Sequence, residues 1–91
     1  MEKYKALLGK NINLELAGEI INSYKIDMIA DKPHHTEGLG DVYKCAVTWT
    51  NKKLADNNDR MDFDPKTLDD LLNNKKAINP VWPAICFRVT E

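Results

Sequence analysis

The stretch VYKCAVTWT, residues 42 to 50, alternates between apolar and polar residues more cleanly than the rest of the chain. Tyr43, Cys45, Val47 and Trp49 fall on one face, and a lysine, an alanine and two threonines fall on the other. Successive side chains of a β-strand point to opposite faces, so this pattern predicts a strand with one buried and one wet face. The segments on either side decide what kind of sheet surrounds it.

Upstream, residues 11 to 30 (NINLELAGEIINSYKIDMIA) fit two structures. Alternation before and after Ala17-Gly18 predicts a β-hairpin with a long second strand. The rival is an amphipathic helix over about residues 13 to 24, which Gly18 would weaken by roughly 1 kcal/mol relative to alanine. The β-branched residues in the second half favour the hairpin, which we prefer. The helix remains an alternative. In the hairpin one face of the second strand carries Tyr24, Ile26, Met28 and Ala30.

Two short helices are predicted. Residues 2 to 8 (EKYKALL) suit a helix that Gly9 ends. Asp64 is a good N-cap and Pro65 suits the first helical position, so a second helix is expected over residues 65 to 74. Its inward residues would be Leu68, Leu71 and Leu72.

The last part of the chain, AICFRVT, predicts a closing strand with Ile85, Phe87 and Val89 inward. The polar residues 51 to 64 are expected to be a connection. The whole is then a single α+β domain, residues 1 to 91, in the order α-β-β-β-α-β. It would have a mostly antiparallel sheet of about four strands and two short helices.

The two cysteines are predicted to be free thiols. Cys45 lies on the inward face of its strand, whereas Cys86 alternates against inward residues and points outward. Two cysteines on opposite faces of one sheet cannot bridge without distortion. Two are also too few for a disulfide scaffold or a zinc cluster.

Composition excludes several classes of protein. The chain has 91 residues, 43% hydrophobic and 30% charged, which is typical of one folded domain rather than a disordered chain. A formal charge of −1 argues against general electrostatic binding to the nucleic-acid backbone. There is no run of 18 apolar residues and no apolar core of a secretory signal, so a soluble cytoplasmic protein is expected.

The segment DKPHHTEGLGD, residues 31 to 41, holds both histidines. His34 and His35, with Glu37 and Asp41 nearby, could act in acid–base chemistry or bind a metal. Adjacent histidines diverge on a strand or helix, however, and the H-x-H and HExxH spacings of metal sites are missing. The segment is too long for a tight hairpin and is interpreted as a recognition loop. No catalytic residue, metal ligand or cofactor is assigned.

Six aspartates lie between residues 56 and 70. The EF-hand pattern fails there, because Arg60 falls at the third ligand position and no closing glutamate follows. The simplest interpretation is a solvated loop followed by a helix start that favours acids. The alternative is an acidic face that steers a basic partner, formed by Asp56, Asp59, Asp62 and Asp64.

Trp82 stands between Pro80 and Pro83 on a segment expected to be extended. Tryptophan is enriched at interface hot spots, so Trp82 is a candidate binding anchor. It could equally plug the open end of a small core.

Residues 6 to 21 (ALLGKNINLELAGEII) resemble the opening of an Sm-like RNA-binding domain, with a short helix, Gly-Lys, an alternating strand and a glycine-containing turn. The resemblance covers less than a quarter of the chain. The helix expected over residues 65 to 74 departs from the run of strands in that family, so no functional residue is carried over.

These observations favour a small regulatory or inhibitory module that binds another protein without catalysis, of the kind encoded on mobile elements. An alternative is a small-molecule or nucleotide-binding domain that uses residues 31 to 41. A further alternative is a nucleic-acid-binding small barrel that uses lysines and tyrosines of the hairpin. An exposed last strand could also pair with a second copy of the chain.

Overall fold

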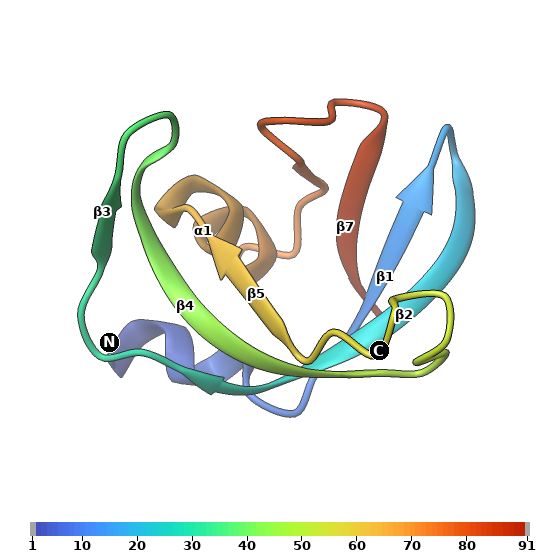
Figure 1. Ribbon diagram of the computed structural model, residues 1–91, viewed down its shortest axis with the longest axis horizontal. Coiled ribbons are helices and arrows are strands. Elements are labelled where there is room, and N and C mark those ends of the chain that lie inside the picture. The colour runs from blue at the N-terminus through green and yellow to red at the C-terminus, as the bar shows by residue number, and fades with distance from the viewer. Residues whose placement is uncertain (1, 91) are drawn as a thin grey trace.

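The computed structural model describes residues 2–90 and consists mainly of one curled antiparallel sheet (Figure 1). A 3-10 helix, η1, precedes the sheet, and a single α-helix, α1, lies late in the chain. The elements are η1 (Glu2–Leu7), β1 (Asn11–Leu16), β2 (Glu19–Ile29), β3 (His34–Thr36), β4 (Gly40–Trp49), β5 (Arg60–Phe63), α1 (Pro65–Leu72), β6 (Ala77–Ile78) and β7 (Ile85–Thr90).

Neighbouring strands follow the order β4, β2, β1, β7 and β6, and both β3 and β5 pair with β4. Every strand pairing is antiparallel. The sheet curls into a half-barrel whose two ends, β5 and β6, are not paired with each other. Helix α1 connects these ends and packs against β6, β7, β4 and η1.

The predicted α+β domain of about four strands and two helices is wrong. Strands hold nearly half of the residues and helices 15%, and the N-terminal segment is a 3-10 turn rather than an α-helix. Three short strands, β3, β5 and β6, occur in stretches where no strand was predicted. Their pairing with β4 or β7 places them in the sheet, and local propensity in two to four residues is too weak to reveal them.

The predicted hairpin of residues 11 to 30 is confirmed as β1 and β2, and the inward face of β4 is buried as expected. At the centre of the core the Tyr24 ring lies near three other rings. Its centroid is 4.9 Å from that of Trp49, 6.0 Å from Phe63 and 5.8 Å from Phe87. These four residues are called the aromatic cluster below.

A β-bulge in β2 overturns one predicted facing. The pairing with β4 shifts register between Ile26 and Met28, so the residues beyond the shift change faces. Met28 is 61% exposed rather than inward, and Ile29 packs against the core in its place. A second bulge lies in β2 at Ile21, because Leu14 and Glu15 of β1 are opposite Asn22 and Ile20. Leu16, at the end of β1, is 41% exposed.

Residues 31 to 41 are not a long loop. Strand β3 pairs with the start of β4, with Thr36 opposite Gly40, so only residues 37 to 39 form the turn. Gly40 has a φ of 73°, a conformation that suits glycine in three-residue hairpin turns. The Thr36 hydroxyl donates to the Gly40 carbonyl at 2.8 Å. The expectation that this segment is too long for a tight hairpin is therefore wrong.

Helix α1 begins at Pro65 as predicted and ends at Leu72, two residues early. Asp64 is extended at the N-cap position, and its carboxylate accepts a hydrogen bond from the Thr67 hydroxyl. The buried Tyr4 hydroxyl donates to Asp69 at 2.9 Å, which ties η1 to α1.

Both cysteines are free, as predicted. Cys45 is buried and Cys86 is half-buried. Burial raises the pKa of the Cys45 thiol to about 12, with a smaller contribution from the negative charge of Asp62.

Candidate functional site

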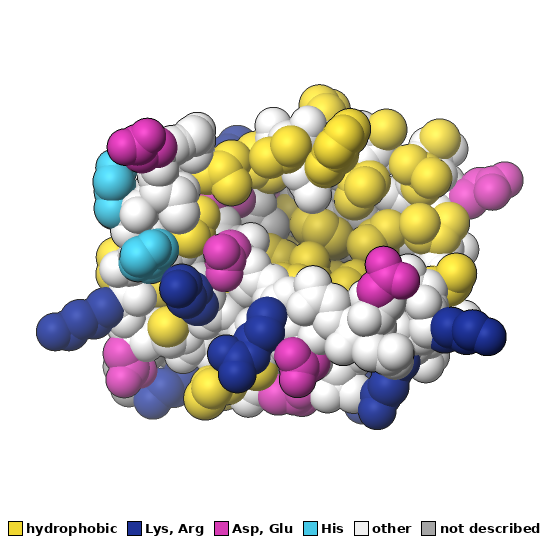
Figure 2. Space-filling model, viewed as in Figure 1, with side chains coloured by type: hydrophobic (Ala, Val, Ile, Leu, Met, Phe, Trp, Pro, Cys, Tyr) yellow, Lys and Arg dark blue, Asp and Glu magenta, His cyan; other side chains and the backbone are white. Residues whose placement is uncertain are grey.

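The concave side of the half-barrel opens to solvent as an apolar hollow (Figure 2). Its floor contains members of the aromatic cluster. Its rim comes from four segments that are distant in the sequence: the β1–β2 turn, the β3–β4 turn, residues 50 to 59 and residues 79 to 84. We call this surface the apolar mouth and define it by Leu14, Leu16, Ile21, Leu39, Leu54, Val81 and Trp82.

Two cavities lie within the mouth. The β1–β2 cavity has a volume of about 660 Å³ and no charged lining residue; it is formed by Leu14, Ile21, Asn22, Trp49, Leu54, Ala55 and Asn58. The β5 cavity has a volume of about 200 Å³ and lies between β5 and residues 79 to 82. Its only charged lining residues are Asp62 and Asp64. The two cavities adjoin, because Leu14 in one is directly opposite Phe87 in the other on paired strands.

Exposed apolar side chains gather at the mouth. Of the ten large hydrophobic residues that are exposed in the described part of the chain, six belong to it. Leu54 and Trp82 are the most open, at 67% and 65% exposure. Singly scattered apolar residues are normal on protein surfaces, but a contiguous patch marks an interaction site.

The turn around Trp82 is held by its own hydrogen bonds. The Asn79 side-chain oxygen accepts the backbone N–H groups of Val81 and Trp82, at 2.9 and 3.0 Å. The N–H of Ile85 donates to the Trp82 carbonyl at 2.8 Å, which closes the turn. The Trp82 indole is 65% exposed and stands at the rim, so it does not plug the open end of the core.

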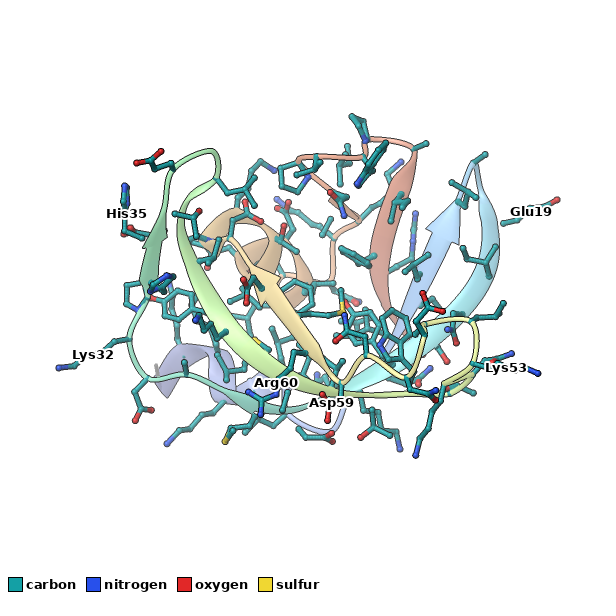
Figure 3. The ribbon with its side chains drawn as sticks, viewed as in Figure 1. Glu19, Lys32, His35, Lys53, Asp59 and Arg60 are labelled. Carbon is teal, nitrogen blue, oxygen red and sulfur yellow. The ribbon has the colours of Figure 1, made fainter. Side chains whose placement is uncertain are left out.

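Apart from Leu39 in the β3–β4 turn, the histidine segment lies outside the mouth. His34 and His35 are successive strand residues, so their side chains diverge. The Nδ1 of His35 on β3 lies 3.1 Å from a carboxylate oxygen of Asp41 on β4, and both side chains are exposed. Figure 3 shows His35 pointing outward from β3. Neither histidine lines a cavity described here, and nor does Glu37 or Asp41. Within residues 2–90, no group of three His, Cys, Asp or Glu side chains is placed to hold a metal.

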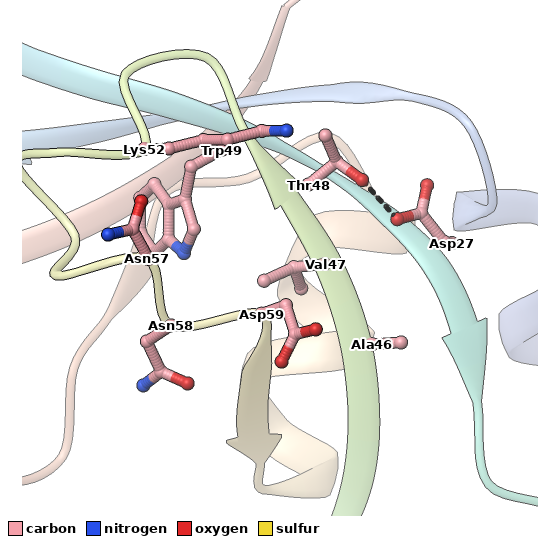
Figure 4. Close-up of a pocket in the computed structure, with 9 residues that line it drawn as sticks. All are labelled: Asp27, Ala46, Val47, Thr48, Trp49, Lys52, Asn57, Asn58 and Asp59. Carbon is pink, nitrogen blue, oxygen red and sulfur yellow. Dashed lines mark hydrogen bonds between the residues drawn. The ribbon is translucent and has the colours of Figure 1, made fainter.

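The four aspartates of the predicted acidic face do not form one face. Asp62 and Asp64 line the β5 cavity. Asp59 instead lines a polar pocket of about 310 Å³ beside β4, together with Lys52 (Figure 4), and its carboxylate is 3.8 Å from the Arg60 Nε. Asp56 lies in a turn with a φ of 53°. Only the first pair belongs to the candidate site.

Of the residues that form the mouth, only Trp82 was predicted as a binding residue from the sequence. Leu54 lies inside the polar run NKKLADNN, and Ile21 was assigned only to a predicted strand. An apolar residue inside a polar connection is the signal that could have identified Leu54.

No known protein family, curated protein or solved structure matches this chain. The resemblance to the opening of an Sm-like domain therefore extends only to local elements: η1, a turn at Gly9, β1 and a turn at Ala17-Gly18 occur in the expected order. None of the helices in the described part of the chain is long and apolar enough to cross a membrane.

Proposed function

We propose that this protein binds another protein through the apolar mouth and acts as a regulatory or inhibitory module without catalysis. The observation that carries the proposal is the convergence of four distant segments on one exposed apolar surface, with Trp82 at its rim. Leaving such a patch in water has a free-energy cost that burial against a partner removes. Tryptophan is also among the residues that contribute most to binding energy at interfaces.

The mouth suits a protein better than the other ligands considered. The β5 cavity is smaller than the roughly 300–1,000 Å³ of typical small-molecule sites. The β1–β2 cavity is large enough, but its polar groups are limited to Asn22, Asn58 and the Trp49 indole, and much of the exposed rim lies outside it. Nucleic acid is disfavoured, because the only charges lining the two cavities are the carboxylates of Asp62 and Asp64.

The test compares two variants with the natural chain. Trp82→Ala removes a 65% exposed side chain from the mouth, and Met28→Ala removes a 61% exposed side chain from the opposite side of the sheet. A protein captured from a lysate of the source organism would be purified and titrated calorimetrically against all three. We expect Trp82→Ala to weaken binding about tenfold or more and Met28→Ala to leave it unchanged. Equal affinity for all three, with circular dichroism showing each folded, would contradict the proposal.

A further inference from the structure

We infer that the partner enters the mouth as an extended segment that pairs with the free edge of β5 and alternates apolar with basic side chains. This inference rests on the proposed function and specifies the kind of partner.

Strand β5 uses only one of its edges. It pairs with β4, with Met61 opposite Cys45 and Phe63 opposite Tyr43, and the Val47 N–H donates to the Asp59 carbonyl at 2.9 Å. In an antiparallel ladder the hydrogen-bonded positions recur at every second residue. Met61 and Phe63 therefore direct their backbone groups at β4, while the residues between them direct theirs to the other side.

On that other side a short row of backbone groups is available. The Arg60 N–H donates a hydrogen bond to the Asn58 side-chain oxygen at 3.1 Å, so it is not available to a partner. Within residues 2–90 no strand other than β4 pairs with β5, which leaves the Arg60 carbonyl and both backbone groups of Asp62 for a partner. Unpaired groups at a sheet edge are a template for an added strand.

The β5 cavity gives the added strand its side-chain preference. Met61 and Phe63 line it from one side, and Val81 and Trp82 from the other, with Phe63 and Phe87 in edge contact at 5.9 Å. A strand along the β5 edge would direct every second side chain into this space. About 200 Å³, with apolar side chains on both sides and polar groups at Asp62, Asp64, Thr67 and Asn79, has room for one or two apolar side chains rather than a separate small molecule.

The charges on this edge select basic residues at the other positions. Asp62 is exposed, forms no ion pair with another described residue, and lines the cavity together with Asp64. Arg60, the nearest base in the sequence, lies beside Asp59 instead, and Lys44, directly opposite Asp62 on β4, forms no ion pair with it. Opposite charges on neighbouring strands stabilise pairing, so lysine or arginine is expected next to Asp62.

The same charges disfavour a second copy of the chain. An antiparallel pair of two β5 edges centred on Asp62 would place this carboxylate directly opposite its copy. Like charges at opposed positions destabilise a pair of strands. A basic extended segment therefore fits this edge better than self-pairing does.

A displayed library of random octapeptides tests the inference. Selection would use the natural chain, with Trp82→Ala protein to remove peptides that bind elsewhere. We expect the enriched peptides to alternate apolar residues with lysine or arginine. Enrichment of acidic peptides, of peptides with helical spacing, or of no peptide at all would overturn the inference.

The best peptide would then be made in two forms, each N-methylated at alternate amides. N-methylation removes hydrogen-bond donors from one edge of a strand, so one form should bind about tenfold or more weakly and the other should bind normally. Asp62→Lys should weaken a basic peptide similarly, whereas the matched change Asp59→Lys, outside the cavity, should not. Equal binding of both methylated forms would overturn the pairing.

Amide hydrogen exchange measured by NMR separates this inference from the proposed function. Peptide binding should slow exchange of the Asp62 N–H about tenfold or more, while the Met61 and Phe63 amides, already bonded to β4, should change little. If binding depends on Trp82 but Asp62 exchange does not slow, strand pairing is refuted and the protein-binding function stands. If a purified partner binds the Trp82→Ala protein normally, the proposed function itself is refuted.

Discussion

Tyr24 has a hydroxyl group that is buried without a hydrogen-bond partner among residues 2–90. Its side chain is 0% exposed, and its ring contacts the three other members of the aromatic cluster. A buried hydroxyl that lacks a partner lowers stability, so the ring accounts for the stabilising contribution of this residue. Tyr4 is the opposite case, because its buried hydroxyl donates to Asp69.

Replacing each tyrosine with phenylalanine separates these cases. Tyr24→Phe should raise the free energy of unfolding by about 1 kcal/mol, because it removes an unpaired polar group. Tyr4→Phe should lower it by about 1 kcal/mol, because it removes a hydrogen bond between η1 and α1. Urea denaturation at pH 7 measures both. A loss of stability in Tyr24→Phe as large as that in Tyr4→Phe would contradict the assignment.

Cys45 should make stability depend on alkaline pH. Burial raises the pKa of its thiol from 9.0 to about 12, so above pH 9 the unfolded chain loses this proton while the folded chain keeps it. The unfolding free energy should therefore fall between pH 9 and pH 12, by up to about 1.4 kcal/mol per pH unit from this group. Urea denaturation at several pH values should show a shallower fall for Cys45→Ala. The raised pKa of buried Tyr24 acts in the same direction and remains in that variant.

At the scale of elements, the β2 bulge decides which side chains stabilise the sheet. Ile26→Ala should lower the unfolding free energy by about 2–5 kcal/mol, because Ile26 is fully buried. Met28→Ala, two residues later, should change it by less than about 0.5 kcal/mol, because the register shift moves Met28 to the surface. Similar losses in the two variants would mean that the strand alternates without a bulge.

The longer elements could be predicted from the sequence. Alternation predicted β1, β2, β4 and β7, and the pair Asp64-Pro65 predicted where α1 begins. The short strands could not be predicted, because HHT, RMDF and AI become strands only through pairing with distant residues. The bulge in β2 also leaves no local signal, since an alternating pattern continues through Met28. The count of four strands was wrong for this reason.

The candidate site was predicted only in part. Trp82 stood out as a large apolar residue between prolines, and the structure places it at the rim of the mouth. His34 and His35 stood out because the chain has only two histidines, but rarity in a sequence says nothing about position, and they lie outside the cavities. The mouth combines four distant segments, and only the curl of the sheet brings them together.

At the scale of the whole molecule, the fluorescence of the two tryptophans distinguishes the rim of the mouth from its floor. Trp82 is 65% exposed at the rim, and Trp49 is 9% exposed in the aromatic cluster. Acrylamide should therefore quench two distinct populations of tryptophan fluorescence. Trp82→Phe should remove the quenchable population and shift the emission maximum to shorter wavelength, because only the buried indole remains. Unchanged quenching in this variant would show that Trp49 is the exposed indole and the mouth is misplaced.

The position of β1 between β2 and β7 constrains how the chain folds while it is being synthesised. Asn11 pairs with Thr90 across 79 residues, so β1 has only one of its two neighbours until β7 has been made. At about 5–20 residues per second, translation takes roughly 4 to 16 seconds to cover that separation. During this interval the nascent hairpin has an open edge and uncovered apolar residues, which chaperones recognise. Closing so long a loop also carries an entropy cost, so the final docking of β7 should limit the folding rate.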